Sequence, residues 1–452
     1  MTVARTDAAR VSVAPRLARV FLGFFCFVLA GYAIVGRDFA HLGVPPIYIG
    51  EITLALGMVA ALTAGNLTSA ILNLPGLALA LLMLWTALRT VPYWNGYEFD
   101  SVRDAMIVFY GLFAYVVASL ILQRPVTLML LLERYKRFIP FMIFLSPILT
   151  ILGPLEVGGQ PLFGSKVGDL SCHLTAILAF ALIGFVRLRP LIVIFILLVE
   201  LFAFTQGREA MLVFMVGCSL ASIFSPDRKA LGRLAALIGA AAAVMCVLAA
   251  LDFKFARDGS ARVISVRQLV LNTTSIFTHA GSEQVQDTKE WRLNWWSDII
   301  DYTVHGRYFW TGKGFGPNLA DTDGYQTNNP EAGEPPLRSP HNAHMTILAR
   351  GGVPALVLWI GALGSWVVAV MRQLIEAKKL RDQWWVGVFA FLLTYWTMMV
   401  IASSFDVALE GPMLGIWFWT IHGIGMAALV LHRHRVAAWQ HGRLRTNAGM
   451  AQ

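Results

Sequence analysis

Long apolar runs alternate with short polar segments along most of this chain. We count twelve runs, most of them close to the length of about 18 residues that a helix needs to cross about 30 Å of hydrocarbon. The fifth run and the two runs on either side of Gly207 are short, and they are the weakest of these assignments. The runs cover residues 18–36, 45–64, 69–88, 103–122, 138–153, 171–187, 190–206, 209–224, 231–251, 344–371, 384–403 and 411–431. This pattern predicts an all-α integral membrane protein with about 12 transmembrane helices.

The longest polar segment, residues 252–343, separates the ninth run from the tenth. Apolar and aromatic side chains recur in it at helical spacing, which predicts a short amphipathic helix from about Thr288 to His305. These side chains are Trp291, Trp295, Ile299 and Tyr302. We therefore expect one long extracytoplasmic loop that contains short amphipathic helices. The predicted parts are a basic tail (1–17), nine spans (18–251), the loop (252–343), three spans (344–431) and a second basic tail (432–452).

Composition and charge support a multi-span protein and give it an orientation. Of the 452 residues, 57% are hydrophobic and 14% are charged, which is far from the composition of a soluble domain. Lys and Arg gather in the tails and in alternate loops, so both termini are expected in the cytoplasm. The other short loops hold only Arg37, Arg89, Arg103, Lys166 and Arg208. Anionic lipids account for the net charge of +9, and no nucleic-acid partner is required.

Two carboxylates, Glu51 and Glu200, fall inside apolar runs, away from the ends of those runs. A carboxylate at membrane depth is costly unless it is paired or faces a wet cavity. Each is therefore a functional candidate, and each is equally well explained as a local helix cap or a structural partner.

The break at Gly207 places a cation at the start of a helix. Arg208 and Glu209 follow the glycine directly, before the next apolar run. A helix N-terminus beside an arginine forms an anion-binding site. The alternative is an arginine that only extends toward the membrane interface.

The long polar segment contains further candidate groups. The turn TGKGFGPN, residues 311–318, brings backbone N–H groups within reach of an anion, although it lacks the spacing of a nucleotide-binding loop. Asp321 and Asp323 are better explained as turn residues than as metal ligands. The spacing of His341 and His344 suits a metal on a helix, but no third ligand is evident, so we expect no metal and one histidine acting as a base.

A pair of carboxylates, Asp406 and Glu410, lies one helical turn apart in the last short outer segment. They are candidates to position an acceptor hydroxyl or to pair with Arg208 or Arg292. The alternative is that they cap helices.

Three segments resemble motifs of the O-antigen ligase and O-antigen polymerase superfamily. TQGREAML is similar to its Thr-x-Ser-Arg-Gly segment, with Gly207 where Ser is usual and Glu209 where Gly is usual. WRLNWWSDIIDYTVHGRYFWTGKGFG resembles its Arg-x-x-x-Trp helix and Gly-x-Gly-Phe-Gly turn, and PHNAHMTILARGGVPALVLW resembles its His-Asn-x-x-Leu motif. The segments lie between residues 202 and 366, in the same order and setting as in the family.

The resemblance implies a class C-like membrane glycosyltransferase of the bacterial inner membrane. Its donor would be a polyprenyl-diphosphate-linked glycan, used at the periplasmic face by an O-antigen ligase or by an O-antigen or exopolysaccharide polymerase. Other polysaccharide-assembly proteins are possible partners. The positions that match the family's diphosphate-binding arginines are Arg208 and Arg292, and His341 matches its catalytic histidine. Asn342 follows in the same motif and, with Asp406 and Glu410, is a candidate for acceptor contact or for support of the site.

The chemistry of the residues agrees with this reading. A diphosphate leaving group needs the forked donors of arginine, and a hydroxyl nucleophile needs a base such as histidine. One displacement would invert the anomeric centre, and two arginines make a metal or other cofactor unnecessary. Two other classes stay open: a polysaccharide or lipid-linked glycan transporter, which would show repeats and several broken helices, and a non-catalytic scaffold.

Overall fold

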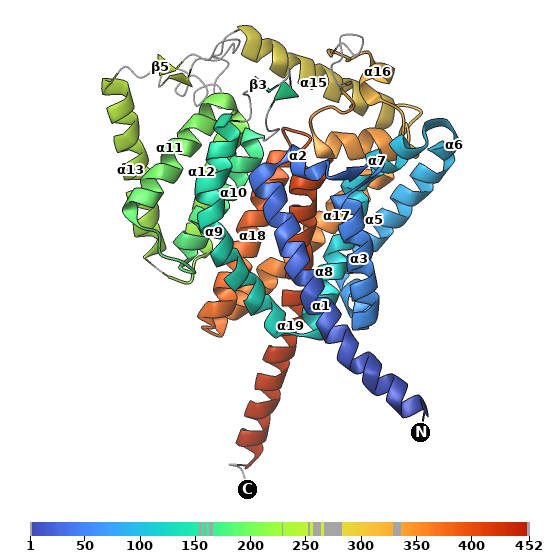
Figure 1. The fold of residues 1–452 in the computed structure, drawn as a ribbon, viewed down its shortest axis with the longest axis vertical. Coiled ribbons are helices and arrows are strands. Elements are labelled where there is room, and N and C mark those ends of the chain that lie inside the picture. The colour runs from blue at the N-terminus through green and yellow to red at the C-terminus, as the bar shows by residue number, and fades with distance from the viewer. Residues whose placement is uncertain are drawn as a thin grey trace.

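The structure, a computed structural model, describes residues 2–152, 156–157, 160–161, 166–227, 229–251, 254–255, 264–265, 283–328 and 336–449. Within these ranges it is predominantly helical, and the longer helices form one bundle (Figure 1). These helices are α1 (Thr2–Val35), α3 (Ile49–Ala64), α5 (Leu74–Thr90), α7 (Phe99–Phe109), α8 (Leu112–Gln123), α9 (Val126–Leu152), α10 (Val167–Ile183), α11 (Pro190–Gln206), α12 (Arg208–Phe224), α13 (Ala230–Ala250), α17 (Ala343–Lys379), α18 (Gln383–Ser403) and α19 (Pro412–Gly449).

Each predicted apolar run lies mainly on these helices, so the all-α membrane class is confirmed. The fourth run is divided between α7 and α8, which meet at a bend of 43°. Among the described residues, six helices are long and apolar enough to cross a membrane, or seven if the bent pair forms one span. The count of twelve spans stays a prediction.

The remaining elements are short, apart from one loop helix. The helices are α2 (Arg37–Ala40), α4 (Leu67–Ile71), η1 (Val91–Tyr93), α6 (Trp94–Tyr97), α15 (Glu283–Thr303) and α16 (Leu319–Asp323). Three antiparallel two-residue ladders join β1 (Gly43–Val44) to β2 (Ile47–Tyr48), β3 (Glu156–Val157) to β4 (Gln160–Pro161) and β5 (Lys254–Phe255) to β6 (Ile264–Ser265). In these ladders Gly43 lies opposite Tyr48, Glu156 opposite Pro161 and Lys254 opposite Ser265. The predicted amphipathic helix is α15, which begins five residues earlier than expected, at Glu283 rather than Thr288.

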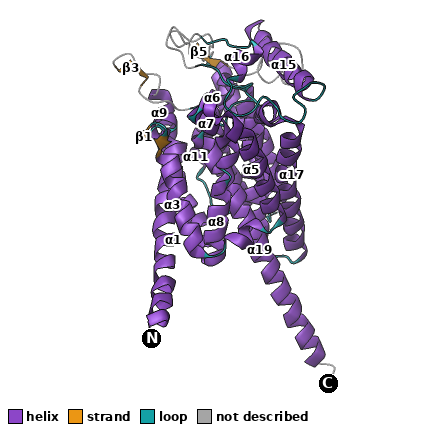
Figure 2. Ribbon diagram, turned by 90° about the vertical axis from the view of Figure 1, so that its right-hand side faces the viewer, coloured by secondary structure: helices purple, strands orange, loops and turns teal. Residues whose placement is uncertain are grey.

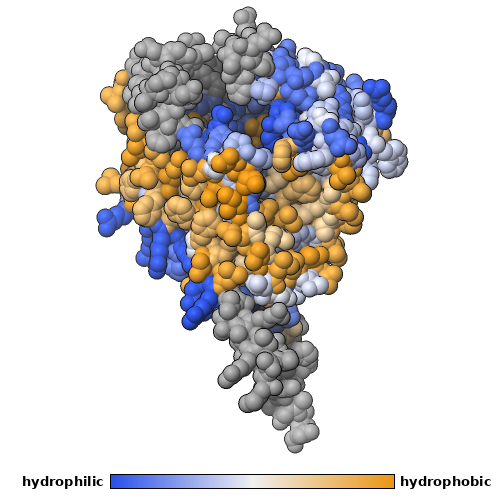
Figure 3. Space-filling model, turned by 45° about the vertical axis from the view of Figure 1, so that its right-hand side comes forward, coloured by the Kyte–Doolittle hydropathy of each residue, from blue (hydrophilic) through white to orange (hydrophobic). Residues whose placement is uncertain are grey.

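The two ends of the bundle differ. Helices α15 and α16 cover one end, here called the loop end, and both chain termini leave the other, here called the terminal end (Figures 1 and 2). A broad hydrophobic band lies between polar surfaces (Figure 3). This arrangement agrees with both termini on one side and the long loop on the other, and the assignment of the loop end to the periplasm stays a prediction.

Buried tryptophans hold the centre of the bundle together. Trp359, Trp366 and Trp419 are fully buried. The indole N–H of Trp366 donates to the His422 carbonyl at 2.9 Å, and that of Trp419 donates to the Ile107 carbonyl at 3.0 Å. A buried indole loses its hydrogen bonds to water, so these carbonyl acceptors remove a desolvation cost while the rings pack.

A glycine-rich turn binds the loop to α17. Gly352 has a φ of 73° and interrupts α17, which frees carbonyl groups that a continuous helix would use. The amide of Lys313 donates to the Ala349 carbonyl at 2.7 Å, and that of Gly314 donates to the Arg350 carbonyl at 2.9 Å. Gly312 adopts a φ of 58°, and a Cβ there would lie 2.4 Å from the Arg350 carbonyl. The turn considered for anion binding therefore uses these amides to cap the break in α17.

An ionic cluster anchors the same region to α7. The Oδ2 atom of Asp104 lies 2.9 Å from Nη1 of Arg350 and 2.9 Å from Nη2 of Arg338. It also accepts the Gly316 amide at 3.2 Å. Because the Arg350 side chain is only 2% exposed and that of Asp104 6%, this cluster is shielded from water and positions the segment that leads into α17.

Candidate active site

His341 lies at the loop end, directly before α17. Its backbone has a φ of 52°, in the left-handed region that side-chain-bearing residues seldom adopt. Asn342 is the N-cap of α17, and its side-chain oxygen accepts the amides of His344 at 2.9 Å and Met345 at 3.1 Å. The indole of Trp296 donates to the Pro340 carbonyl at 2.9 Å. The surrounding structure therefore holds His341 in a strained conformation from both sides, and Asn342 acts as a cap.

The imidazole of His341 is held by Asp406, which lies in the turn between α18 and α19. Nδ1 of His341 is 3.1 Å from Oδ1 of Asp406. An ionised carboxylate only accepts hydrogen bonds, so Nδ1 carries the proton and Nε2 of the neutral ring presents a lone pair. The other carboxylate oxygen, Oδ2, lies 3.2 Å from Nζ of Lys166. The result is a Lys166–Asp406–His341 chain.

The electrostatics of this chain keep Asp406 ionised. Burial alone would raise the pKa of Asp406, but the hydrogen bond from His341, the charge of Lys166 and the Val407 amide together hold it well below its usual range. Burial lowers the pKa of Lys166, but the carboxylates of Asp406 and Asp169 outweigh that effect and raise it. Both charges are therefore present at neutral pH.

Arg292, on α15, lies beside this chain. Its Nη1 donates to the carbonyl of Phe405 at 2.9 Å, immediately before Asp406. The neighbouring Trp291 ring meets the His341 ring edge-on, with centroids 6.4 Å apart. The amphipathic helix thus brings an arginine to the turn that orients the histidine.

Arg208 begins α12, after Gly207 in extended conformation. Glu209, the next residue, lies against Gly168 in the first turn of α10: a Cβ on that glycine would be 3.2 Å from a carboxylate oxygen. Glu209 is also close enough to Asp406 and Arg292 for their charges to act on it. The break between α11 and α12 was predicted, and it places the start of α12 next to the other candidate groups.

Glu410 belongs to a different set of contacts. Its Oε1 accepts a hydrogen bond from the Thr346 hydroxyl at 2.8 Å, one helical turn after Asn342. Burial raises the pKa of Glu410 by more than the Thr346 hydrogen bond and the charge of Arg350 lower it. Glu410 therefore faces the first turns of α17, whereas Asp406 faces His341.

His344 has partners for both ring nitrogens. The Trp359 indole donates to Nδ1 at 2.9 Å, and Nε2 lies 3.0 Å from the Ser404 hydroxyl. The searched part of the chain holds no group of three His, Cys, Asp or Glu residues placed to bind a metal. Of the two histidines, only His341 is held in a manner that suits a base.

The carboxylates in the apolar runs have local partners. Glu51 accepts the Tyr48 amide at 3.0 Å and the Tyr110 hydroxyl at 3.0 Å. Glu200 accepts the hydroxyls of Ser171 at 2.5 Å and Thr175 at 3.0 Å. These contacts favour the structural reading of both residues.

The Asp-x-Asp pair also serves the loop's own packing. Asp323 accepts the Trp295 indole at 2.7 Å and pairs with Lys313. Asp321 accepts the Gln326 amide at 2.8 Å. Their partners agree with turn residues rather than metal ligands.

Comparison with known families identifies the central part of the chain. Residues 191–360 match a family model described as O-antigen ligase. This segment is similar to the O-antigen ligase family. The match covers less than half of the chain and confirms, for this segment, the resemblance to the O-antigen ligase and O-antigen polymerase superfamily seen in the three motifs. No curated protein matches the chain.

The matched domain contains only part of the candidate site. It runs from α11 to the middle of α17 and includes Arg208, Arg292 and His341. Lys166 and Asp406, which complete the chain with His341, lie on either side of it. Lys166 was not among the site residues predicted from the sequence. It is, however, one of very few cations in the short outer loops, and this position marks it as a candidate.

Proposed function

We propose that this O-antigen ligase-family protein transfers a glycan from a polyprenyl-diphosphate-linked donor to an acceptor hydroxyl at the periplasmic face of the bacterial inner membrane. It would act as an O-antigen ligase or as an O-antigen or exopolysaccharide polymerase. The observation that carries the proposal is the hydrogen bond from Nδ1 of His341 to Asp406, 3.1 Å long, beside Arg292 at the loop end. It presents Nε2 of His341 as a base next to an arginine suited to a phosphate anion.

In the proposed reaction, Nε2 of His341 takes the proton of the acceptor hydroxyl while its oxygen attacks the anomeric carbon of the donor sugar. The bond from that carbon to the diphosphate oxygen breaks, and its electron pair leaves with the polyprenyl diphosphate. Arg208 and Arg292 stabilise the leaving diphosphate, so no general acid or metal is needed. Asp406 stabilises the imidazolium that forms, and Lys166 holds Asp406. A single displacement inverts the anomeric configuration.

The direct test is donor consumption in membranes that carry the protein. Polyprenyl-diphosphate-linked glycan should disappear as acceptor-linked glycan forms. If each product carries a single transferred glycan, the protein is a ligase. If the products form a ladder of glycan lengths, the protein is a polymerase. Glycan that crosses the membrane while the donor stays intact would instead support a transporter.

Arg292→Lys is expected to lower kcat/KM about 100-fold, the size of effect seen when one donor to a developing anion is lost. Arginine offers a fork that can donate to the Phe405 carbonyl and to a phosphate together, whereas one ammonium is a poorer match to both. Arg307→Lys is the matched control, because Arg307 is exposed in the same loop and should tolerate the change. Equal activity of the two variants would remove Arg292 from the mechanism.

Asp406→Asn is expected to lower transfer about 10- to 100-fold, as for partners that orient metal-bound histidines. The neutral amide of asparagine holds the Nδ1-protonated tautomer of His341 less firmly than the charged carboxylate of Asp406 does. Asp301→Asn, at an exposed position on α15, is the control and should retain activity. Full activity of Asp406→Asn would show that His341 needs no orienting carboxylate.

The same variant gives a pH dependence of stability. The pKa of Asp406 is lower in the folded protein than in the unfolded chain, so its stabilisation is complete above the unfolded value of about 4. This stabilisation is lost as pH falls through the depressed folded-state pKa. The difference in Tm between wild type and Asp406→Asn should therefore shrink as pH falls below about 4. A difference that grows as pH falls below about 4 would contradict this linkage.

A further inference from the structure

Two adjoining cavities lie toward the terminal end of the bundle, away from the candidate active site. The outer cavity, of about 290 Å³, is bordered by α1, α8 and α9, and the inner cavity, of about 120 Å³, continues between α1, α9, α18 and α19. Leu22, Leu131 and Arg134 line both. Because Arg19, Arg124 and Leu130 of the outer lining are exposed, this cavity reaches the protein surface.

The outer cavity is cationic. Arg19, Arg124 and Arg134 line it, and none of the described residues in its lining is a carboxylate. The 27-residue helix α9 begins beside it, so the positive end of a helix dipole adds to the three arginines. This combination attracts an anion, such as an anionic lipid head group.

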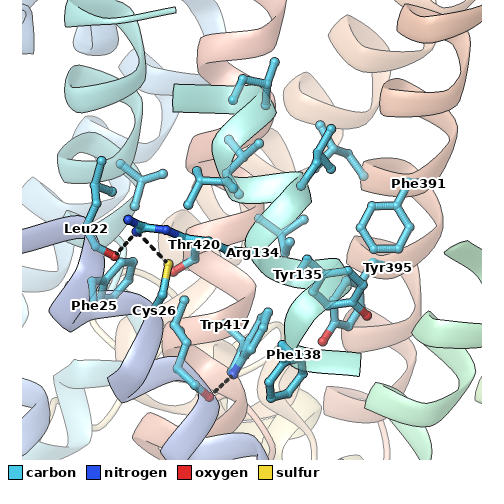
Figure 4. Close-up of a pocket in the computed structure, with 18 of the residues that line it drawn as sticks. Leu22, Phe25, Cys26, Arg134, Tyr135, Phe138, Phe391, Tyr395, Trp417 and Thr420 are labelled. Carbon is cyan, nitrogen blue, oxygen red and sulfur yellow. Dashed lines mark hydrogen bonds between the residues drawn. The ribbon is translucent and has the colours of Figure 1, made fainter. Parts of the chain in front are cut away.

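The inner cavity is apolar apart from its entrance. Aliphatic and aromatic side chains form its walls, including Phe25, Phe138 and Phe391 (Figure 4). Arg134 reaches from α9 to α1, where its Nη1 donates to the Leu22 carbonyl at 2.8 Å and lies 3.6 Å from the Cys26 sulfur (Figure 4). The guanidinium thus marks the boundary between a cationic mouth and a hydrocarbon-lined slot.

We propose that these cavities form a binding site for one phospholipid with an anionic head group. The phosphate contacts Arg19, Arg124 and Arg134, and part of one acyl chain occupies the inner slot. A free phosphate would use only the mouth, and a zwitterionic lipid would lack the net charge that the three arginines complement. Only an anionic amphiphile matches both halves. This site is independent of the proposed glycan transfer.

The test uses the purified full-length protein, freed of lipid in detergent. Phosphatidylglycerol, phosphatidylcholine with the same acyl chains, or glycerol phosphate is added, and bound molecules are counted by native mass spectrometry. We expect one phosphatidylglycerol to be retained in preference to the other two. Arg124→Gln should weaken its binding about fivefold, as for loss of one cation near a charged membrane surface.

Two further variants separate this site from general surface attraction. Arg137→Gln removes an exposed cation on α9 outside both linings and should leave binding unchanged. Ala30→Phe places a ring in the inner slot and should reduce phosphatidylglycerol binding with all three arginines present. Equal retention of the two lipids, equal binding of glycerol phosphate, equal loss in Arg137→Gln and Arg124→Gln, or no effect of Ala30→Phe would each overturn the proposal.

Discussion

Replacing His341 by asparagine is expected to lower glycan transfer by about 10²- to 10⁴-fold, the contribution typical of a general base. Asparagine tolerates the left-handed backbone better than alanine does, so this variant removes the imidazole while accommodating the φ of 52°. Its side chain cannot take a proton at neutral pH, so the acceptor hydroxyl would have to react unassisted. Donor consumption in membranes at matched expression measures the loss.

The controls for His341→Asn separate its role from those of nearby histidines and of metals. His305→Asn changes an exposed histidine after α15 and should leave the rate unchanged. EDTA should not lower wild-type transfer, because the arginines carry the leaving-group charge. If His341→Asn consumes donor at the wild-type rate, His341 is not the base. Loss of wild-type activity in EDTA would refute metal independence.

Replacing Arg350 by methionine is expected to reduce the free energy of unfolding by about 3 kcal/mol, the lower part of the range for breaking a buried ion pair. The methionine fills part of the same volume and removes the most buried of the three arginines that pair with Asp104, leaving Arg338 and Arg103. It also removes the donor to the Pro317 carbonyl at 3.0 Å. Denaturant unfolding in detergent would measure the change.

Arg372→Met is the matched control, because Arg372 is exposed on the same helix. It should change stability by less than about 0.5 kcal/mol. The double variant Arg350→Met with Asp104→Asn should lose less free energy of unfolding than the sum of the two single changes, because each change removes the same ion pair. Equal stability of Arg350→Met and Arg372→Met would show that the ionic cluster does not anchor the loop.

The helices could be predicted because their signals are local. Apolar runs, the break at Gly207 and the spacing of Trp291 and Trp295 each depend on residues near one another in the chain. The motif positions Arg292 and His341 were also visible. The bend between α7 and α8 was missed because hydropathy alone does not detect a change of direction inside an apolar run.

The pairings in the site could not be derived in the same way. His341 and Asp406 are 65 residues apart, and Lys166 and Asp406 are 240 residues apart, so their contacts depend on how the helices pack. The sequence offered pairing with an arginine as one role for Asp406, whereas the structure pairs it with a lysine and a histidine. Asn342 is the exception: its capping role follows from the preference of asparagine for N-cap positions, which is a local signal in the sequence.

The position of Asp406 has a consequence for biosynthesis. The ribosome makes the chain from its N-terminus, so Arg208, Arg292 and His341 are present before the turn between α18 and α19 exists. Under the proposed mechanism, a nascent chain at that stage can attract a donor but has no carboxylate to hold its histidine. Full activity then begins only when the final helical hairpin has entered the membrane, and unfinished chains consume the lipid-linked glycan more slowly.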